Sequence, residues 1–200
     1  MIYFLTVRII IFILYVFFGF KVYGKENIPR KGAFLLASNH TSHFDPPILA
    51  AGFHMKRLQF MAKEELFYGR FFGWYIRRLG AYPLRREKTD VGAIRESIRR
   101  IRKGLPIVVF PEGGRSTDGA IREGLPGIAL LASKERIPIV PAFISGAVDV
   151  LKKGSRRVYF SRITLRIGTP LVFKDHERGS YEAMTQQVME AIKELSSVAP

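Results

Sequence analysis

The sequence predicts an α/β fold, in which a central, mostly parallel mixed sheet is flanked by helices and preceded by an apolar helix. Short apolar runs alternate along the 200 residues with longer stretches of helical periodicity, an order typical of parallel sheets connected by helices. The first twenty residues differ because they are almost uniformly apolar. We therefore expect a membrane-anchoring or interfacial segment over residues 1–24 and one α/β domain over residues 25–200.

The amino-terminal segment reads IYFLTVRIIIFILYVFFGF over residues 2–20, with Arg8 as its single charge. As a helix it would reach about 28 Å at ~1.5 Å per residue, slightly less than the ~30 Å hydrocarbon core of a bilayer. No small-residue cleavage site follows, which favours an uncleaved anchor over a secretory signal. We expect shallow insertion, with a full span as the alternative, and the basic remainder of the chain on the cytoplasmic face of the membrane. A buried core helix is disfavoured because about 180 further residues supply little protein to surround it.

The remaining elements follow from apolar periodicity and from turn residues. Strands are expected over residues 33–40, 58–63, 81–85, 105–113, 137–146 and 158–168. Helices are expected over residues 47–53, 65–79, 90–103, 125–134 and 181–197. In the helix over 90–103, Ile94, Ile98 and Ile101 recur at helical spacing and predict the packing face, with arginines around the rest.

The charge of the chain restricts its partners. There are 32 Lys and Arg residues against 17 Asp and Glu, a net charge of +15, which should attract phosphate groups. The absence of cysteine excludes a thiolate nucleophile and any cysteine-based zinc site. Nucleic acid is disfavoured, since no RNA-binding aromatic pattern or zinc-finger spacing is present and an apolar amino terminus is unusual for such a protein. A non-catalytic basic membrane-binding module remains as an alternative to an enzyme.

The stretch SNHTSHFDPP, residues 38–47, follows the first predicted strand and contains His40, His43 and Asp45. A carboxylate that accepts a hydrogen bond from one imidazole nitrogen raises the basicity of the other, so His40 and Asp45 can form a general-base dyad. An ordinary polar turn is the alternative, with Asn39 and Ser42 as turn formers. A metal site of His40, His43 and Asp45 is disfavoured because no fourth ligand or HExxH pattern is visible. We expect no bound metal.

A second stretch, VVFPEGGRST over residues 108–117, is again a buried strand that ends in a polar turn. Gly113 and Gly114 let backbone N–H groups approach a ligand, and Arg115 can bind a phosphate through two parallel hydrogen bonds. No lysine follows the glycines at P-loop spacing, which disfavours nucleotide hydrolysis. The alternative is a plain turn with a solvated arginine.

NHTSHFD and FPEGGRST, about seventy residues apart, with LGAYPLRRE between them and IPIVPAFISG after them, resemble the motifs of the 1-acyl-sn-glycerol-3-phosphate (lysophosphatidate) acyltransferases. The resemblance covers nearly the whole chain in the right order. His40 and Asp45 match the family's His-four-residues-Asp signature. Glu112, Gly113, Arg115 and Ser116 match its third motif, where Gly114 replaces the usual threonine. Its second motif ends in a phosphate-binding arginine that corresponds to Arg85.

The resemblance implies acyl transfer from a thioester, either acyl-CoA or acyl-ACP (acyl-carrier protein), to the sn-2 hydroxyl of lysophosphatidate, giving phosphatidate. His40 is then the base, Asp45 its orienting partner, and Arg115 with Arg85 the phosphate clamp. Glu112 is expected either to bond the glycerol part of the substrate or to hold the Arg115 loop. No cofactor is expected beyond the acyl donor. The partners are lysophosphatidate, the thioester and anionic membrane lipid, and a different lyso-lipid or glycerol 3-phosphate is the alternative acceptor.

Overall fold

The structure, a computed structural model, describes residues 2–85, 90–116, 118–150, 159–173 and 181–198. Its core is a seven-stranded sheet in the order β1-β7-β6-β2-β5-β3-β4. All neighbouring strands are parallel except β6 and β7, so β1 and β7 run opposite to the rest. The strands are β1 (Lys21–Tyr23), β2 (Leu35–Ser38), β3 (Gln59–Lys63), β4 (Ala81–Leu84), β5 (Ile107–Val109), β6 (Ile139–Ser145) and β7 (Thr164–Ile167). The predicted α/β fold with a mostly parallel sheet is confirmed.

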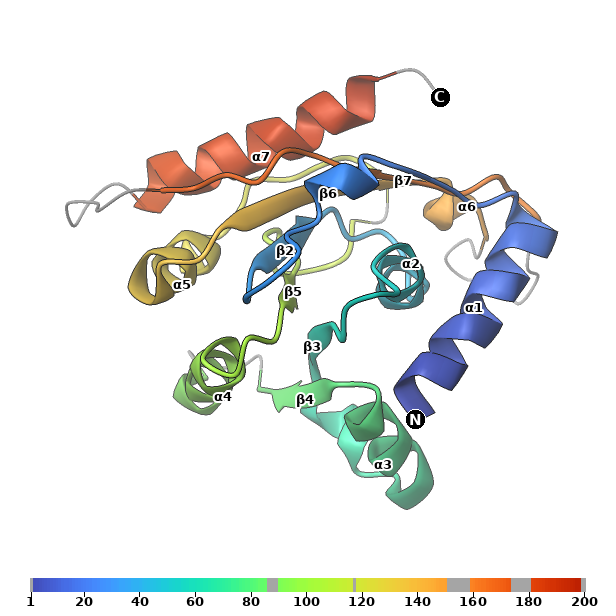
Figure 1. The fold of residues 1–200 in the computed structure, drawn as a ribbon, viewed down its shortest axis with the longest axis horizontal. Helices are drawn as coiled ribbons and strands as arrows, with labels where there is room; N and C mark the ends of the chain where they lie inside the picture. The colour runs from blue at the N-terminus through green and yellow to red at the C-terminus, as the bar shows by residue number, and fades with distance from the viewer. Residues whose placement is uncertain (1, 86–89, 117, 151–158, 174–180, 199–200) are drawn as a thin grey trace.

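Helices cover both faces of the sheet, as Figure 1 shows. On one face lie α4 (Val91–Ile101), α5 (Gly127–Glu135) and α7 (Tyr181–Ser197), and on the other α1 (Ile2–Phe18) and α2 (Asp45–Gly52). The strand β2 contributes to both cores, since Leu35 and Ala37 pack with α5 and α7 whereas Leu36 packs with α1 and α2. Side chains alternate across a strand, so a strand buried on both faces is apolar throughout.

Most predicted elements lie close to where the sequence places them, with five main differences. The predicted helix over 65–79 begins as a 3₁₀ turn, η2 (Glu64–Phe67), before α3 (Arg70–Arg78), and α6 (Ala147–Val150) and β1 were not predicted. The strand expected over 158–168 is confined to β7, and residue 158 lies outside the described residues. The helix expected from residue 47 begins at Asp45, because prolines are compatible with the first helical turn.

The helix α1 has two different apolar faces. Tyr3, Val7, Leu14 and Phe18 are buried against the rest of the protein, and the Tyr3 hydroxyl donates to the Lys56 carbonyl oxygen at 3.0 Å. The opposite face is exposed and mostly apolar, with Arg8 as its one charged residue and with Phe4, Leu5, Ile9, Phe12, Ile13, Tyr15, Val16 and Phe17. At 17 residues α1 is about 26 Å long, and no described helix is long and apolar enough to cross a membrane.

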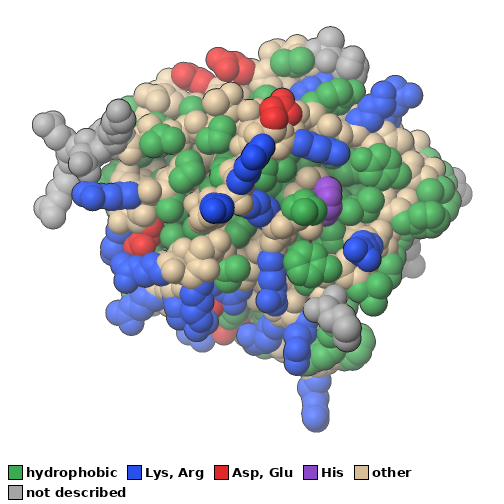
Figure 2. Space-filling model, viewed as in Figure 1, with side chains coloured by type: hydrophobic (Ala, Val, Ile, Leu, Met, Phe, Trp, Pro, Cys, Tyr) green, Lys and Arg blue, Asp and Glu red, His purple; other side chains and the backbone are tan. Residues whose placement is uncertain are grey.

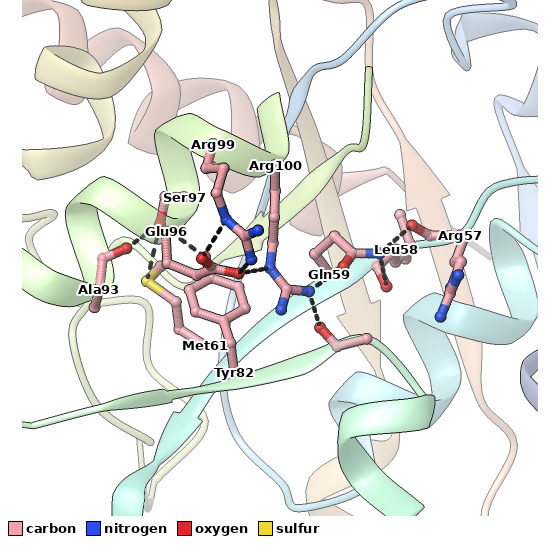
Figure 3. Close-up of polar contacts among 11 residues, drawn as sticks. Arg57, Leu58, Gln59, Met61, Tyr82, Ala93, Glu96, Ser97, Arg99 and Arg100 are labelled. Carbon is pink, nitrogen blue, oxygen red and sulfur yellow. Dashed lines mark hydrogen bonds and ion pairs between the residues drawn. The ribbon is translucent and has the colours of Figure 1, made fainter. Parts of the chain in front are cut away.

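The packing face of α4 differs from the prediction. Ile94 is 39% exposed, whereas Ser97 is buried and its hydroxyl lies 2.8 Å from the hydroxyl of Tyr82 in β4 (Figure 3). Arg100 places its guanidinium over the Tyr82 ring and hydrogen-bonds Gln59 and the Gly80 carbonyl oxygen. Burial raises the pKa of Tyr82 to about 12. A polar network, rather than an isoleucine stripe alone, therefore joins α4 to the outermost strand, β4.

Candidate active site

The two polar stretches singled out in the sequence meet at one edge of the sheet. The strands β2 and β5 are parallel neighbours, with Leu36 opposite Val108. The carboxyl ends of parallel neighbours lie at the same edge, so the loop carrying His40 and the loop carrying Glu112 are adjacent. Their contact is direct, because the backbone N–H of Ser116 donates to the carbonyl oxygen of His40 at 2.8 Å. A site at this edge is thus built from segments distant in the sequence.

His40 and Asp45 form a hydrogen-bonded pair. Nδ1 of His40 lies 2.8 Å from Oδ2 of Asp45, whose side chain is fully buried, while the His40 side chain is 13% exposed. The same oxygen accepts the backbone N–H groups of Thr41 at 2.7 Å and Ser42 at 2.8 Å. A carboxylate at Nδ1 fixes the tautomer with the proton on that nitrogen, which leaves Nε2 as the proton acceptor. The predicted dyad geometry is therefore present.

Asn39 and Ser42 lie in the loop as structural supports. The Asn39 side chain accepts the Ile144 N–H at 2.8 Å and donates to the Ile144 carbonyl oxygen at 3.0 Å, which joins the end of β2 to β6. The Ser42 hydroxyl accepts the N–H of Phe44 at 3.2 Å. Both side chains are buried, so they stabilise the turn and are not exposed to a substrate.

The turn after β5 has a glycine that its conformation requires. Gly113 has a φ of 68°, and a Cβ there would lie 2.6 Å from Cδ1 of Leu125. Gly114 has no such constraint, since a Cβ would meet no atom within 4 Å. The Ser116 hydroxyl donates to Asp118 at 2.6 Å, and Thr117 lies outside the described residues. The turn therefore requires glycine at position 113, whereas position 114 has room for a side chain.

Arg115 is exposed and lies near the dyad. Its guanidinium forms no hydrogen bond or ion pair with the part of the chain that the structure describes. Partial desolvation, followed by electrostatic interactions with Arg115 and His40, lowers the pKa of His43. An uncommitted guanidinium beside the dyad is suited to bind an anionic group of a substrate.

Arg85 lies farther from the dyad. It follows β4, which β3 and β5 separate from β2, so the strands alone put it about 14 Å away at ~4.8 Å per strand. Its side chain is 74% exposed and pairs with Glu64 through contacts of 2.8 and 3.0 Å. The structure therefore places Arg85 at the correct edge of the sheet but gives it a carboxylate partner there.

The face of the molecule drawn in Figure 2 is basic and apolar. Figure 2 shows Lys and Arg side chains over the face drawn, gathered most densely over α4, with apolar side chains between them and few acidic ones. Among the described residues no group of three or more His, Asp or Glu side chains could hold a metal ion. The His40–Asp45 pair supplies groups for proton transfer, and the guanidinium of Arg115 can bind an anion.

Known proteins are similar to this chain in sequence and in fold. A family model described as Acyltransferase matches residues 19–145, which include β2, α2 and β5. The 1-acyl-sn-glycerol-3-phosphate acyltransferase of Bacillus subtilis (strain 168) is 31% identical over 187 residues, covering 90% of this chain and 89% of that protein. The protein of the same name from Streptococcus pneumoniae (strain ATCC BAA-255 / R6) is 30% identical over 164 residues, covering 81% of this chain and 59% of that protein. The crystal structure of the 1-acyl-sn-glycerophosphate (LPA) acyltransferase PlsC from Thermotoga maritima matches with a TM-score of 0.78 and 30% identity, over 97% of this chain and 81% of that one.

Proposed function

The chain belongs to the acyltransferase family, and we propose that it moves a fatty acyl group from a thioester to the sn-2 hydroxyl of lysophosphatidate, giving phosphatidate. The observation that carries the proposal is the His40–Asp45 pair at 2.8 Å, with the uncommitted Arg115 beside it. A base next to an anion-binding group suits an acceptor that carries both a hydroxyl and a phosphate. The names of the relatives, at about 30% identity, support the same acceptor.

His40 acts as the general base of this reaction. Its Nε2 takes the proton of the acceptor hydroxyl while the oxygen attacks the thioester carbonyl carbon, and Asp45 stabilises the imidazolium that forms. The tetrahedral intermediate then collapses, the carbon–sulfur bond breaks, and the leaving thiolate takes the proton from the imidazolium. The acyl group passes directly to the acceptor, so no covalent acyl-enzyme is required and the absence of cysteine is no obstacle.

Arg115 binds the phosphate of the acceptor and thereby holds the sn-2 hydroxyl near Nε2 of His40. Arg85 is the proposed second phosphate ligand. Since Arg85 forms a bidentate pair with Glu64, the phosphate must displace that carboxylate or share the guanidinium with it. Exposed ion pairs contribute little free energy, so the displacement is an accessible step.

The proposed reaction takes place at the cytoplasmic surface of a membrane, where its lipid acceptor is found. The exposed face of α1 supplies apolar side chains, and α3 adds Phe71, Phe72 and Trp74. A net charge of +15 favours anionic headgroups and equally an acidic carrier protein or a phosphorylated coenzyme as the acyl donor. The double variant Ile9→Ser, Phe12→Ser should reduce sedimentation with anionic vesicles without lowering the free energy of unfolding, because both side chains are exposed.

A radiolabelled transfer assay tests the proposed reaction. Purified protein is incubated with acyl-CoA or acyl-ACP and with lysophosphatidate, another lyso-lipid or glycerol 3-phosphate, and the products are separated. The proposal predicts labelled phosphatidate as the main product. If another acceptor is acylated much faster, the acceptor assignment is wrong. If no acceptor is labelled, the protein is a non-catalytic membrane-binding module.

A further inference from the structure

We propose that Phe110 and Glu112, in the segment that leaves β5, are positioning residues that fix the orientation of His40. The proposal rests on the proposed role of His40 as the base, and adds how the chain holds that base still. A base must be held within a narrow range of orientations to reach the hydroxyl proton of a bound acceptor. Asp45 holds one ring nitrogen but leaves the ring free to tilt about that hydrogen bond.

Phe110 restricts the ring plane. The imidazole of His40 stacks on the phenyl ring of Phe110 with a centroid separation of 3.9 Å and an interplanar angle of 13°. Phe110 is itself half-buried and packs against the core that lies under α1 and α2, so it is a firm support. One face of the imidazole is therefore covered, and tilting toward that face is blocked by close packing.

Glu112 restricts the backbone of His40. Its Oε1 accepts the His40 N–H at 3.1 Å, and its Oε2 accepts the Arg122 N–H at 3.2 Å. Both carboxylate oxygens are thus engaged by backbone groups of the protein. Of the two roles expected from the sequence, the geometry points to holding loops together rather than bonding the glycerol part of the substrate.

Together these contacts fix His40 through several of its groups. Glu112 binds its N–H, Ser116 donates to its carbonyl oxygen, Asp45 binds Nδ1 and Phe110 covers the ring. Three of these four partners come from the segment that follows β5, some seventy residues along the chain. The turn FPEGG, residues 110–114, therefore supports the base and also precedes Arg115 directly in the chain.

The kinetic test uses conservative changes with matched controls. Phe110→Leu removes the stacked ring, and Phe110→Tyr retains it. Glu112→Gln places an amide donor against one of two backbone N–H groups. We expect Phe110→Leu and Glu112→Gln to lower kcat by about 10- to 100-fold, with KM for lysophosphatidate changed less than about twofold. Phe110→Tyr should remain near the wild-type kcat.

The controls change the same residue types away from His40. Phe60→Leu alters a half-buried ring that packs against the same core, and Glu123→Gln removes a carboxylate from the neighbouring loop. Both should retain wild-type kcat. If Phe110→Leu and Glu112→Gln retain kcat as well, or if Glu112→Gln raises KM with kcat unchanged, the positioning role is wrong.

A second readout needs no substrate. Protons of an imidazole stacked on a phenyl ring resonate upfield, so NMR of the protein with ¹³C-labelled histidine reports the stack directly. We expect the resonances of the His40 ring protons to move downfield in Phe110→Leu, which lacks the phenyl ring. We expect a downfield shift in Glu112→Gln as well, because the imidazole is then held less firmly against the phenyl ring. Unmoved resonances in Glu112→Gln would overturn the proposal even if the protein acylates no lyso-lipid. Conversely, an inactive wild-type protein with these NMR shifts would contradict the proposed function alone.

Discussion

Oδ2 of Asp45 accepts a hydrogen bond from Nδ1 of His40 at 2.8 Å and, at the same time, the backbone N–H groups of Thr41 and Ser42. One oxygen therefore shapes the turn and orients the base. The other oxygen, Oδ1, is buried and has no hydrogen-bond partner among the described residues. Because all three hydrogen bonds reach Oδ2, a side chain that keeps an oxygen at this position but has no charge can maintain the turn. The charge of Asp45 can therefore be tested separately from its role in the turn.

Asp45→Asn should abolish most transfer and leave the fold nearly intact. The amide oxygen can occupy the position of Oδ2 and keep the turn, but a neutral side chain stabilises the imidazolium far less, so transfer should fall by about 10²- to 10⁴-fold. Asp45→Ala should show the same loss and also lower the free energy of unfolding by about 1–3 kcal/mol, because two backbone N–H groups, one buried and one partly buried, lose their acceptor. Chemical denaturation and initial rates measure both effects. Transfer by Asp45→Asn at a rate close to that of the wild type would contradict a role for the negative charge of Asp45 in stabilising the imidazolium.

The two glycines of the FPEGG turn should respond differently to substitution. Gly113→Ala forces a Cβ into a left-handed conformation and against Leu125, which should cost about 1–2 kcal/mol and displace Glu112. Gly114→Ala or Gly114→Thr should change the free energy of unfolding by less than about 0.5 kcal/mol, since the position is open. Thermal unfolding and transfer rates compare the variants. An equal loss of stability and of transfer rate in the Gly113 and Gly114 variants would contradict the conformation of the turn described above.

Arg115→Ala should weaken binding of acceptors that carry a phosphate. Hydrogen bonds to a charged group contribute about 1.5–3 kcal/mol, so KM for lysophosphatidate should rise by about 10- to 100-fold with a smaller change in kcat. KM for an uncharged monoacylglycerol acceptor should not change. Arg95→Ala, an exposed arginine on α4, is the charge-matched control. An equal rise in KM for both acceptors would argue against a phosphate contact.

The stability of the protein should depend on Glu96 in a defined pH range. Hydrogen bonds from Arg99, opposed by desolvation and assisted by Arg100, lower the pKa of Glu96 to about 2 from its ordinary value of 4.5. The unfolded chain binds the proton more tightly, so this stabilisation is complete above about pH 4.5 and is lost as the pH falls toward 2. Glu96→Gln should therefore lower the free energy of unfolding by about 1 kcal/mol at pH 7, discounted for its partial exposure. Chemical denaturation should show that the difference in the free energy of unfolding between the wild type and Glu96→Gln is smaller at pH 3 than at pH 7. An equal difference at both pH values would contradict the lowered pKa of Glu96.

Part of this architecture can be read from the sequence because it depends on local patterns. The buried strand β2 ends in a polar turn, and so does β5, which is enough to place His40 and Glu112 at one edge once the sheet is known to be parallel. The spacing of His40 and Asp45 within a single turn is likewise local. Apolar periodicity and turn residues therefore predict most elements and the dyad.

Other features depend on partners that are distant in the sequence. The edge strand β1 has three residues and no buried one, so its pairing with β7 leaves no apolar pattern. The burial of Ser97 depends on the hydroxyl of Tyr82 on a neighbouring element, which overrides the isoleucine spacing of α4. In the same way Phe110 lies within the stretch VVFPEGGRST, but its stacking on His40 depends on the fold and leaves no signal in the sequence.

The role of His40 as the base is tested most directly by the rate of phosphatidate formation by His40→Ala, measured with a labelled acyl thioester and lysophosphatidate. Loss of the general base should reduce the rate by about 10²- to 10⁴-fold. Binding to anionic vesicles should be unchanged, because the exposed apolar face of α1 is on a different element. Transfer by His40→Ala at a rate close to that of the wild type would contradict the assignment of His40 as the base.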